Sequence, residues 1–201
     1  MIEKEKLVHL YHQEQKSMQD IAEVLECSLH QVQYWLRKHK IQTRNRSEAL
    51  YIKNNPDGDP FAVKQSFDKQ DLVLLGLGLG LWWGEGSKLH KGTIRLGNTD
   101  PRLIKKFVSF LTDILGVKKE KIRYGLQVFS DMDPVEAKKF WLETLGISVQ
   151  QMLPSVVVTP TGKIGTYRKK SRYGVLTVYC ANIKLRSIFD QLMEKYAFRN
   201  F

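Results

Sequence analysis

The sequence predicts an α+β fold that is preceded by a small all-α domain. Three observations support this prediction. Helical periodicity with capping residues dominates residues 2–38, turn-forming residues crowd Asn54–Pro60, and after residue 69 helix patterns alternate with short strand patterns. The chain of 201 residues is long enough for one ordinary domain or two small ones. We therefore expect a helical domain at 1–46, a linker at 47–68 and an α+β domain at 69–201.

The N-terminal domain is expected to contain a helix-turn-helix. After an opening helix, a second helix starts behind the N-cap candidate Ser17 and buries the Ile21-Ala22 pair. Ser28 then caps a third helix, with Gln31 as its capping-box partner. The segment resembles the helix-turn-helix of resolvases and simple transcription regulators, although Glu26 stands where such turns often have a glycine. A small helical protein-interaction module is the alternative.

The third helix is the candidate for reading DNA bases. If it enters a major groove, Gln31 and Gln33 lie early on its exposed side and suit two hydrogen bonds to adenine. Arg37 and Lys38 lie later on the helix and are expected to contact phosphates.

Two arginines, Arg44 and Arg46, follow the third helix at the end of the expected helical domain. An extended arm of this kind can follow a minor groove, and a solvated linker is the equal alternative. The run Asn54–Pro60 is dense in turn formers and is the predicted domain boundary.

The most informative segment is 72–88, LVLLGLGLGLWWGEGSK, which predicts a helix. Gly76, Gly80 and Gly84 share one face because they are spaced at i, i+4 and i+8. Each glycine in a helix interior costs about 1 kcal/mol relative to alanine, so a bare face indicates close approach of another backbone. The uncharged run is shorter than the ~20 residues of a membrane span. A core helix that merely tolerates glycine is the plainer alternative.

The segments that follow predict the sheet and its covering helices. Ser87–Lys91 and Thr93–Asn98 are expected to form a hairpin that turns at Gly92. Asp100-Pro101 and Asp133-Pro134 open two helices, which Gly116 and Gly146 end. The other expected elements are strands at Ile122–Phe129, Val156–Val158 and Tyr173–Cys180, and a last helix at Ile183–Tyr196.

The glycine-rich helix also carries a family resemblance. Residues 78–86, GLGLWWGEG, look like the LAGLIDADG motif of homing endonucleases. Glu85 matches the acidic residue of that motif, and Gly80 and Gly84 match its helix-packing positions. The strand at 94–98 and the helix after Asp100-Pro101 resemble the next elements of the same domain, so that the similarity covers roughly residues 69–196. The resemblance implies a LAGLIDADG-like domain of helices and an antiparallel saddle sheet.

The resemblance implies a chemistry and an assembly. Glu85, helped by the main-chain carbonyl of Gly84, would hold Mg²⁺ for the hydrolysis of DNA phosphodiesters. Only one acidic motif is found, so cutting both strands would need a homodimer joined through Gly76, Gly80 and Gly84. The alternative partner for this seam is the helix Pro134–Leu145 of the same chain. A faint echo of the strand and helix at 95–107 in residues 178–189 leaves open that the second half is a degenerate repeat.

Double-stranded DNA is the expected partner. The net charge is +11 and its excess is concentrated in residues 161–201. The resemblance places the saddle sheet on the DNA, with candidate contacts from Lys88, Arg95, Arg123 and Gln127. A basic cluster is expected to contact phosphates, with a solvated loop as the alternative. Its members are Lys163, Arg168, Lys169, Lys170 and Arg172.

Composition limits the other classes of function. Two cysteines make neither a disulfide framework nor a zinc pattern, and the five histidines show no metal-ligand spacing. The N-terminus has no apolar targeting core, so we expect a cytoplasmic protein, associated with the nucleoid if bacterial or archaeal, and no membrane partner. The leading hypothesis is a Mg²⁺-dependent homing-type endonuclease. The alternatives are a transcription regulator on a catalytically inactive scaffold of the same kind and, with less support, a protein-interaction adaptor.

Overall fold

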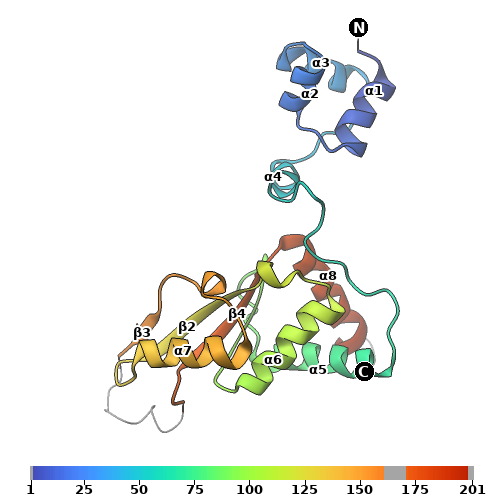
Figure 1. The fold of residues 1–201 in the computed structure, drawn as a ribbon. Helices are drawn as coiled ribbons and strands as arrows, with labels where there is room; N and C mark the ends of the chain where they lie inside the picture. The colour runs from blue at the N-terminus through green and yellow to red at the C-terminus, as the bar shows by residue number, and fades with distance from the viewer. Residues whose placement is uncertain (1, 161–170, 199–201) are drawn as a thin grey trace. The chain divides into compact units, whose positions relative to one another are not determined.

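The computed structural model describes residues 2–160 and 171–198 and divides the chain into two compact units, Met1–Asp59 and Pro60–Phe201 (Figure 1). Each unit has its own hydrophobic core. Within the described residues, no helix is long and apolar enough to cross a membrane.

The first unit is all helical. It consists of α1 (Lys4–Val8) continued by a π-helical turn (His9–Gln13), α2 (Met18–Val24), α3 (Leu29–Lys38) and α4 (Arg46–Asn54). Ser17 caps α2 and Ser28 caps α3, and the predicted Gln31 completes the second capping box. Glu26 adopts a left-handed φ of 48° between α2 and α3, so this turn forms without a glycine. The three-helix core is formed by Leu7, Leu10, Tyr11, Ile21, Ala22, Val32, Leu36 and Ile41.

Residues 47–68, the expected linker, are partly structured at both ends. Asn45 caps α4 by accepting a hydrogen bond from the Glu48 amide at 2.9 Å, so most of the segment's first part is helical. Phe61 is buried in the second core. The amide of Ala62 donates to the Gly116 carbonyl at 3.2 Å, which ties the segment's last part to the second unit. The Asn45 cap therefore orders the first part of residues 47–68, and the buried Phe61 orders the last part.

The second unit has a mixed α+β fold, as the sequence predicts. Its helices are α5 (Lys69–Glu85), α6 (Pro101–Ser109), α7 (Pro134–Leu145) and α8 (Ile183–Met193). Its strands are β1 (Thr93–Asn98), β2 (Arg123–Phe129), β3 (Val157–Thr159) and β4 (Val175–Ala181). Asp100 and Asp133 cap α6 and α7, and Gly146 ends α7 with a left-handed φ of 64°. Short π-helical turns extend α6 and α8 at Phe110–Ile114 and Glu194–Phe198.

The sheet differs from the predicted antiparallel one in two places. Its order is β1-β4-β2-β3, with β4 antiparallel to both neighbours but β3 parallel to β2. The expected hairpin strand Ser87–Lys91 is absent. Only Gly86 bridges to Leu96, and the Ser87 amide donates to the Arg95 carbonyl at 3.0 Å, before the chain turns away.

One face of the sheet is buried by helices. Alternate residues of β1, β2 and β4 point into the core, and α5, α6, α7 and α8 pack on the sheet from this side (Figure 1). Burial raises the pKa of the Tyr124 hydroxyl to about 12 and that of the Cys180 thiol to about 11. Both groups stay protonated at neutral pH, so neither is an activated nucleophile. The other face of the sheet is not covered by these helices and carries polar side chains, among them those of Arg95, Arg123 and Tyr179.

Candidate functional site

Glu85 is the last residue of α5 and is exposed. The helix begins at a capping box formed by Asp68 and Asp71. It ends where the Gly86 amide donates to the Trp82 carbonyl at 2.8 Å. A Cβ at residue 86 would come within 2.3 Å of the Trp82 ring, so the close fold-back after Glu85 requires glycine. The Glu85-Gly86 pair therefore places an exposed carboxylate at the end of the helix.

The four glycines inside α5 have two different environments. Gly76, Gly80 and Gly84 are exposed, and a Cβ at each would have no neighbour within 4 Å. Gly78 is buried, and a Cβ there would lie 2.1 Å from Cγ of Phe110. Packing within the chain thus explains Gly78 but leaves the other three unexplained. The helix Pro134–Leu145, which is α7, packs against α6 and β2, and no described residue covers the predicted seam.

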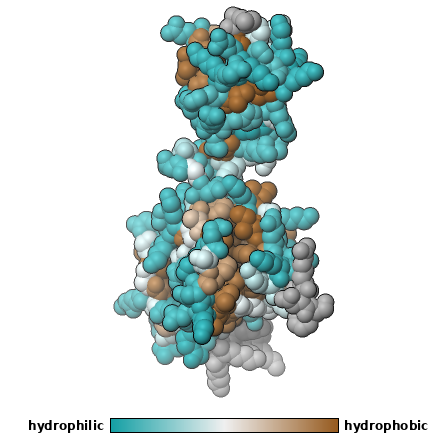
Figure 2. Space-filling model, turned by 90° about the vertical axis from the view of Figure 1, so that its right-hand side faces the viewer, coloured by the Kyte–Doolittle hydropathy of each residue, from teal (hydrophilic) through white to brown (hydrophobic). Residues whose placement is uncertain are grey.

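Large apolar side chains lie beside the exposed glycines. Leu72 is 50 % exposed, Val73 71 % and Leu77 41 %, all on a helix that otherwise forms the core. Figure 2 shows that hydrophobic side chains reach the surface of the second unit on the face it draws. A single chain therefore leaves an apolar, glycine-rich surface of α5 open to solvent.

Lys88 occupies the carbonyl end of α5. Its ammonium donates to the carbonyls of Trp82 at 3.0 Å and Trp83 at 2.6 Å, and lies 5.0 Å from the centre of the Trp82 ring. A cation at this end complements the helix dipole. Lys88 thus lies next to Glu85 in the chain and contacts α5 instead of extending from a strand.

A magnesium ion would find few ligands in one chain. No group of three or more His, Cys, Asp or Glu side chains clusters among the described residues. The Glu85 carboxylate and a main-chain carbonyl are oxygen donors of the kind that Mg²⁺ prefers, but the ion demands near-octahedral coordination. The residues present therefore fit Mg²⁺ only if a second copy of the chain, a DNA phosphate and water supply the remaining ligands of its coordination shell.

The open face of the sheet carries a row of basic and aromatic side chains. Arg95 of β1, Tyr179 of β4 and Arg123 of β2 are directly paired across the three strands. The Arg95 guanidinium stacks 4.6 Å from the Tyr179 ring centre and donates to its hydroxyl at 3.3 Å. Arg123 turns back and donates to the Glu120 and Ile122 carbonyls. The structure thus brings two predicted residues together around Tyr179, which sequence reasoning missed.

The next rows are small and polar. Gly97, Thr177 and Gly125 pair across the same strands, and Gly125 leaves room for Tyr179, whose Cε2 would lie 2.8 Å from an added Cβ. Gln127 donates to the Thr159 hydroxyl at 2.8 Å. The alternation of Val175–Ala181 was the signal that could have placed Thr177 and Tyr179 on this face.

The predicted basic cluster is only partly described. Lys163, Arg168, Lys169 and Lys170 lie outside the described residues. Arg172 is exposed, forms an ion pair with Glu136 at 3.4 Å and lies 5.2 Å from the Tyr173 ring centre.

In the first unit, the predicted base-reading residues have different surroundings. Gln31 is exposed, but its carbonyl oxygen accepts the Ser28 amide at 3.1 Å in the capping box. Gln33 and Arg37 are exposed on α3 and line the same surface hollow. The Lys38 ammonium lies 4.7 Å from the Trp35 ring centre. Among the two glutamines, Gln33 is therefore the less constrained.

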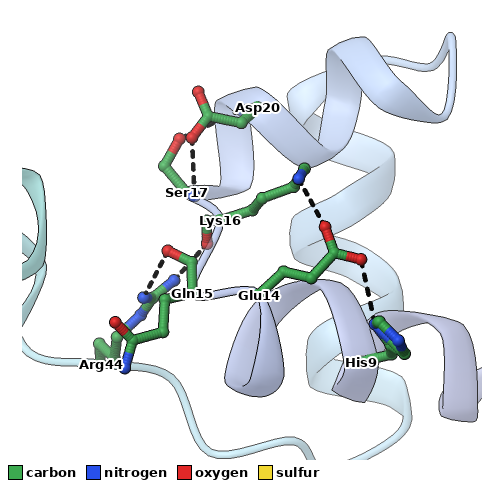
Figure 3. A network of polar contacts seen from close by, with 7 residues as sticks. All are labelled: His9, Glu14, Gln15, Lys16, Ser17, Asp20 and Arg44. Carbon is green, nitrogen blue, oxygen red and sulfur yellow. Dashed lines mark hydrogen bonds and ion pairs between the residues drawn. The ribbon is translucent and has the colours of Figure 1, made fainter. Parts of the chain in front are cut away.

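Arg44 belongs to a polar network instead of an extended arm (Figure 3). Its guanidinium stacks 4.1 Å from the Tyr11 ring centre and donates to the carbonyls of Gln15 and Lys16. Arg46 is exposed at the start of α4. These residues form neither the extended arm nor the solvated linker, because Arg44 fastens the chain to the turn before α2 and the residues after Asn45 are helical. Contact of Arg44 and Arg46 with DNA stays a prediction.

Comparison with protein-family models, curated proteins and solved structures finds no match to this chain.

Proposed function

We propose that the protein is a DNA-binding endonuclease of the homing type, which hydrolyses phosphodiesters as a homodimer using Mg²⁺ held by Glu85. The observation that supports this most is the open surface of α5. Three glycines on one face have no neighbour where a Cβ would stand, apolar side chains flank them, and a carboxylate ends the same helix.

A second copy of α5 is the occupant that fits this surface. Glycines let two backbones approach closely, and a two-fold axis there would bring two Glu85 carboxylates towards each other. Glu85 and the Gly84 carbonyl would hold the metal ions. Bound Mg²⁺ would supply a polarised water and stabilise charge on the phosphate.

The remaining residues have binding roles in this proposal. On the polar face of the sheet, Arg95 and Arg123 supply positive charge to a DNA backbone, and Tyr179 and Gln127 supply hydrogen-bonding groups at the same surface. In the first unit, α3 presents Gln33 and Arg37 for base and phosphate contacts. Binding of DNA across the polar face of the sheet, in the manner of a saddle, is part of the proposal.

The test uses a supercoiled plasmid that carries the genomic DNA flanking the gene. The wild-type chain is expected to cut it in Mg²⁺ and not in EDTA. Glu85→Gln removes the charge but keeps the shape, so cleavage should be abolished while duplex affinity is retained. Glu143→Gln is the matched control, because Glu143 is exposed and pairs only loosely with Lys139 at 3.9 Å. Undiminished cleavage by Glu85→Gln would overturn the proposal at this site.

A transcription regulator without nuclease activity is the second candidate. It is favoured by the helix-turn-helix and by Lys88, whose ammonium already occupies the carbonyl end of α5. Tight, sequence-selective binding to that flanking DNA with no Mg²⁺-dependent cleavage would establish this candidate and exclude the endonuclease.

A further inference from the structure

Arg186 is the one charged residue that is buried among those the structure describes. It lies on α8, is 6 % exposed and points into the second unit. Burying a guanidinium is costly unless its donors are satisfied. The contacts of Arg186 therefore indicate what the buried charge does.

The guanidinium of Arg186 contacts the chain on both sides of Glu85. Its Cζ lies 4.6 Å from the ring centre of Trp82, three residues before Glu85. Its Nη1 donates to the carbonyls of His90 and Thr93, both at 3.2 Å, in the turn that follows Glu85. Its Nε donates to Asp190 at 2.9 Å. One side chain thus joins α8, the last turns of α5 and the turn before β1.

Trp82 is packed between the Phe189 ring and the backbone at Gly86. Trp82 is 4 % exposed and meets the Phe189 ring edge-on at 4.9 Å. The backbone at Gly86 lies directly against the same tryptophan, because a Cβ added at residue 86 would come within 2.3 Å of the Trp82 ring. A shift of Trp82 would therefore be passed to the Glu85-Gly86 backbone.

We propose that Arg186 is a positioning residue for Glu85, holding Trp82 and the 90–93 turn so that the carboxylate is presented in a fixed place. The inference rests on the proposed endonuclease function. A lysine cannot replace Arg186 fully, because its point charge lacks the planar fork that stacks on Trp82 and reaches two carbonyls together with Asp190. Groups that orient a metal-binding residue typically contribute about 10–100-fold to activity or metal affinity.

The experiment compares Arg186→Lys with wild type in the full-length protein. Single-turnover cleavage of the flanking-DNA plasmid should fall about 10–100-fold, and the Mg²⁺ concentration for half-maximal rate should rise. Affinity for the same duplex in EDTA should be unchanged. Hydrogen exchange provides a readout independent of activity: the amides of Gly86, Ser87 and Thr93 should exchange faster, while those of β2 and β4 keep their protection.

Two controls separate positioning from general stability. Arg102→Lys alters an exposed arginine that pairs with Asp100 at 2.9 Å, and should change none of these quantities. Asp190→Asn removes the negative charge but keeps a side-chain oxygen that can accept from Nε of Arg186, so the guanidinium should stay on its carbonyls and the Mg²⁺ dependence should stay that of wild type.

The outcomes are distinguishable. Unchanged exchange at residues 86–93, or an unchanged Mg²⁺ dependence in an active Arg186→Lys protein, overturns the positioning role and leaves the endonuclease standing. A loss of duplex affinity equal to the loss of rate also overturns it, since the effect would then be structural. A wild-type chain that cuts no duplex overturns the proposed function itself, and the role of Arg186 towards cleavage with it.

Discussion

At the scale of single residues, side chains that appear equivalent in the sequence have different partners in the structure. Both Gln31 and Gln33 lie early on α3, yet Gln31 closes a capping box. Both Arg44 and Arg46 follow the helix-turn-helix, yet Arg44 is held by the carbonyls of Gln15 and Lys16. Caps could be predicted because they depend on residues three positions apart. The partners of Arg44 could not, because they lie far away in the sequence.

Base reading through α3 should depend on Gln33. Gln33→Ala is expected to relax preference at one base pair, at a cost of ~1–3 kcal/mol on the cognate site only. Arg37→Ala should instead weaken cognate and scrambled duplexes alike and lower the log–log salt slope by about 0.9. Salt titrations on both duplexes measure these effects. Equal weakening of both duplexes by Gln33→Ala would refute base reading at this position.

Gln31 should behave as a structural residue. Gln31→Ala removes the bond from the Ser28 amide, so the first unit should lose about 0.5–1.5 kcal/mol of unfolding free energy. Thermal unfolding followed by the fluorescence of Trp35 in a background where the other tryptophans are phenylalanine measures this loss. If Gln31→Ala leaves the free energy of unfolding unchanged but loses base preference, Gln31 reads a base and is not a structural residue.

At the scale of elements, the sequence predicted the helices better than the sheet. The glycine-rich helix, the caps of α6 and α7 and the glycine end of α7 are local signals, and the structure confirms them. The parallel pairing of β3 with β2 and the absence of a strand at Ser87–Lys91 depend on contacts between distant segments. The glycines of α5 could be placed on faces, but only the structure shows that Gly78 packs within the chain.

The two kinds of glycine in α5 should respond oppositely to alanine. Gly78→Ala drives a Cβ to 2.1 Å from Cγ of the fully buried Phe110, which belongs at the upper end of the about 1–3 kcal/mol that overpacking costs and so exceeds the ~1 kcal/mol that helix propensity returns. In a single chain Gly76→Ala meets nothing and should keep only the gain, so the comparison is made at a protein concentration at which the chain is monomeric. Urea unfolding in a Trp35→Phe background measures the second unit alone, because the other tryptophans are Trp82, Trp83 and Trp141. Equal shifts for the two variants would contradict this division.

At the scale of the whole molecule, the proposed function needs two chains. Gly80→Leu should leave the monomer folded, because nothing lies within 4 Å of its Cβ position, but should keep two copies of α5 apart. Sedimentation with and without duplex DNA is expected to show dimers for wild type and monomers for the variant. Gly92→Leu, at another open glycine, should remain dimeric. A wild-type protein that is monomeric even on DNA would rule out the seam.

The central claim is that two Glu85 carboxylates, one from each chain, cut one DNA strand each. It is tested most directly with mixed dimers of wild type and Glu85→Gln, prepared by co-expression with two different affinity tags and sequential purification. On the supercoiled plasmid in Mg²⁺, wild-type dimers should give linear DNA, and mixed dimers should stop at nicked circles. Mixed dimers that linearise the plasmid as wild type does would contradict the account.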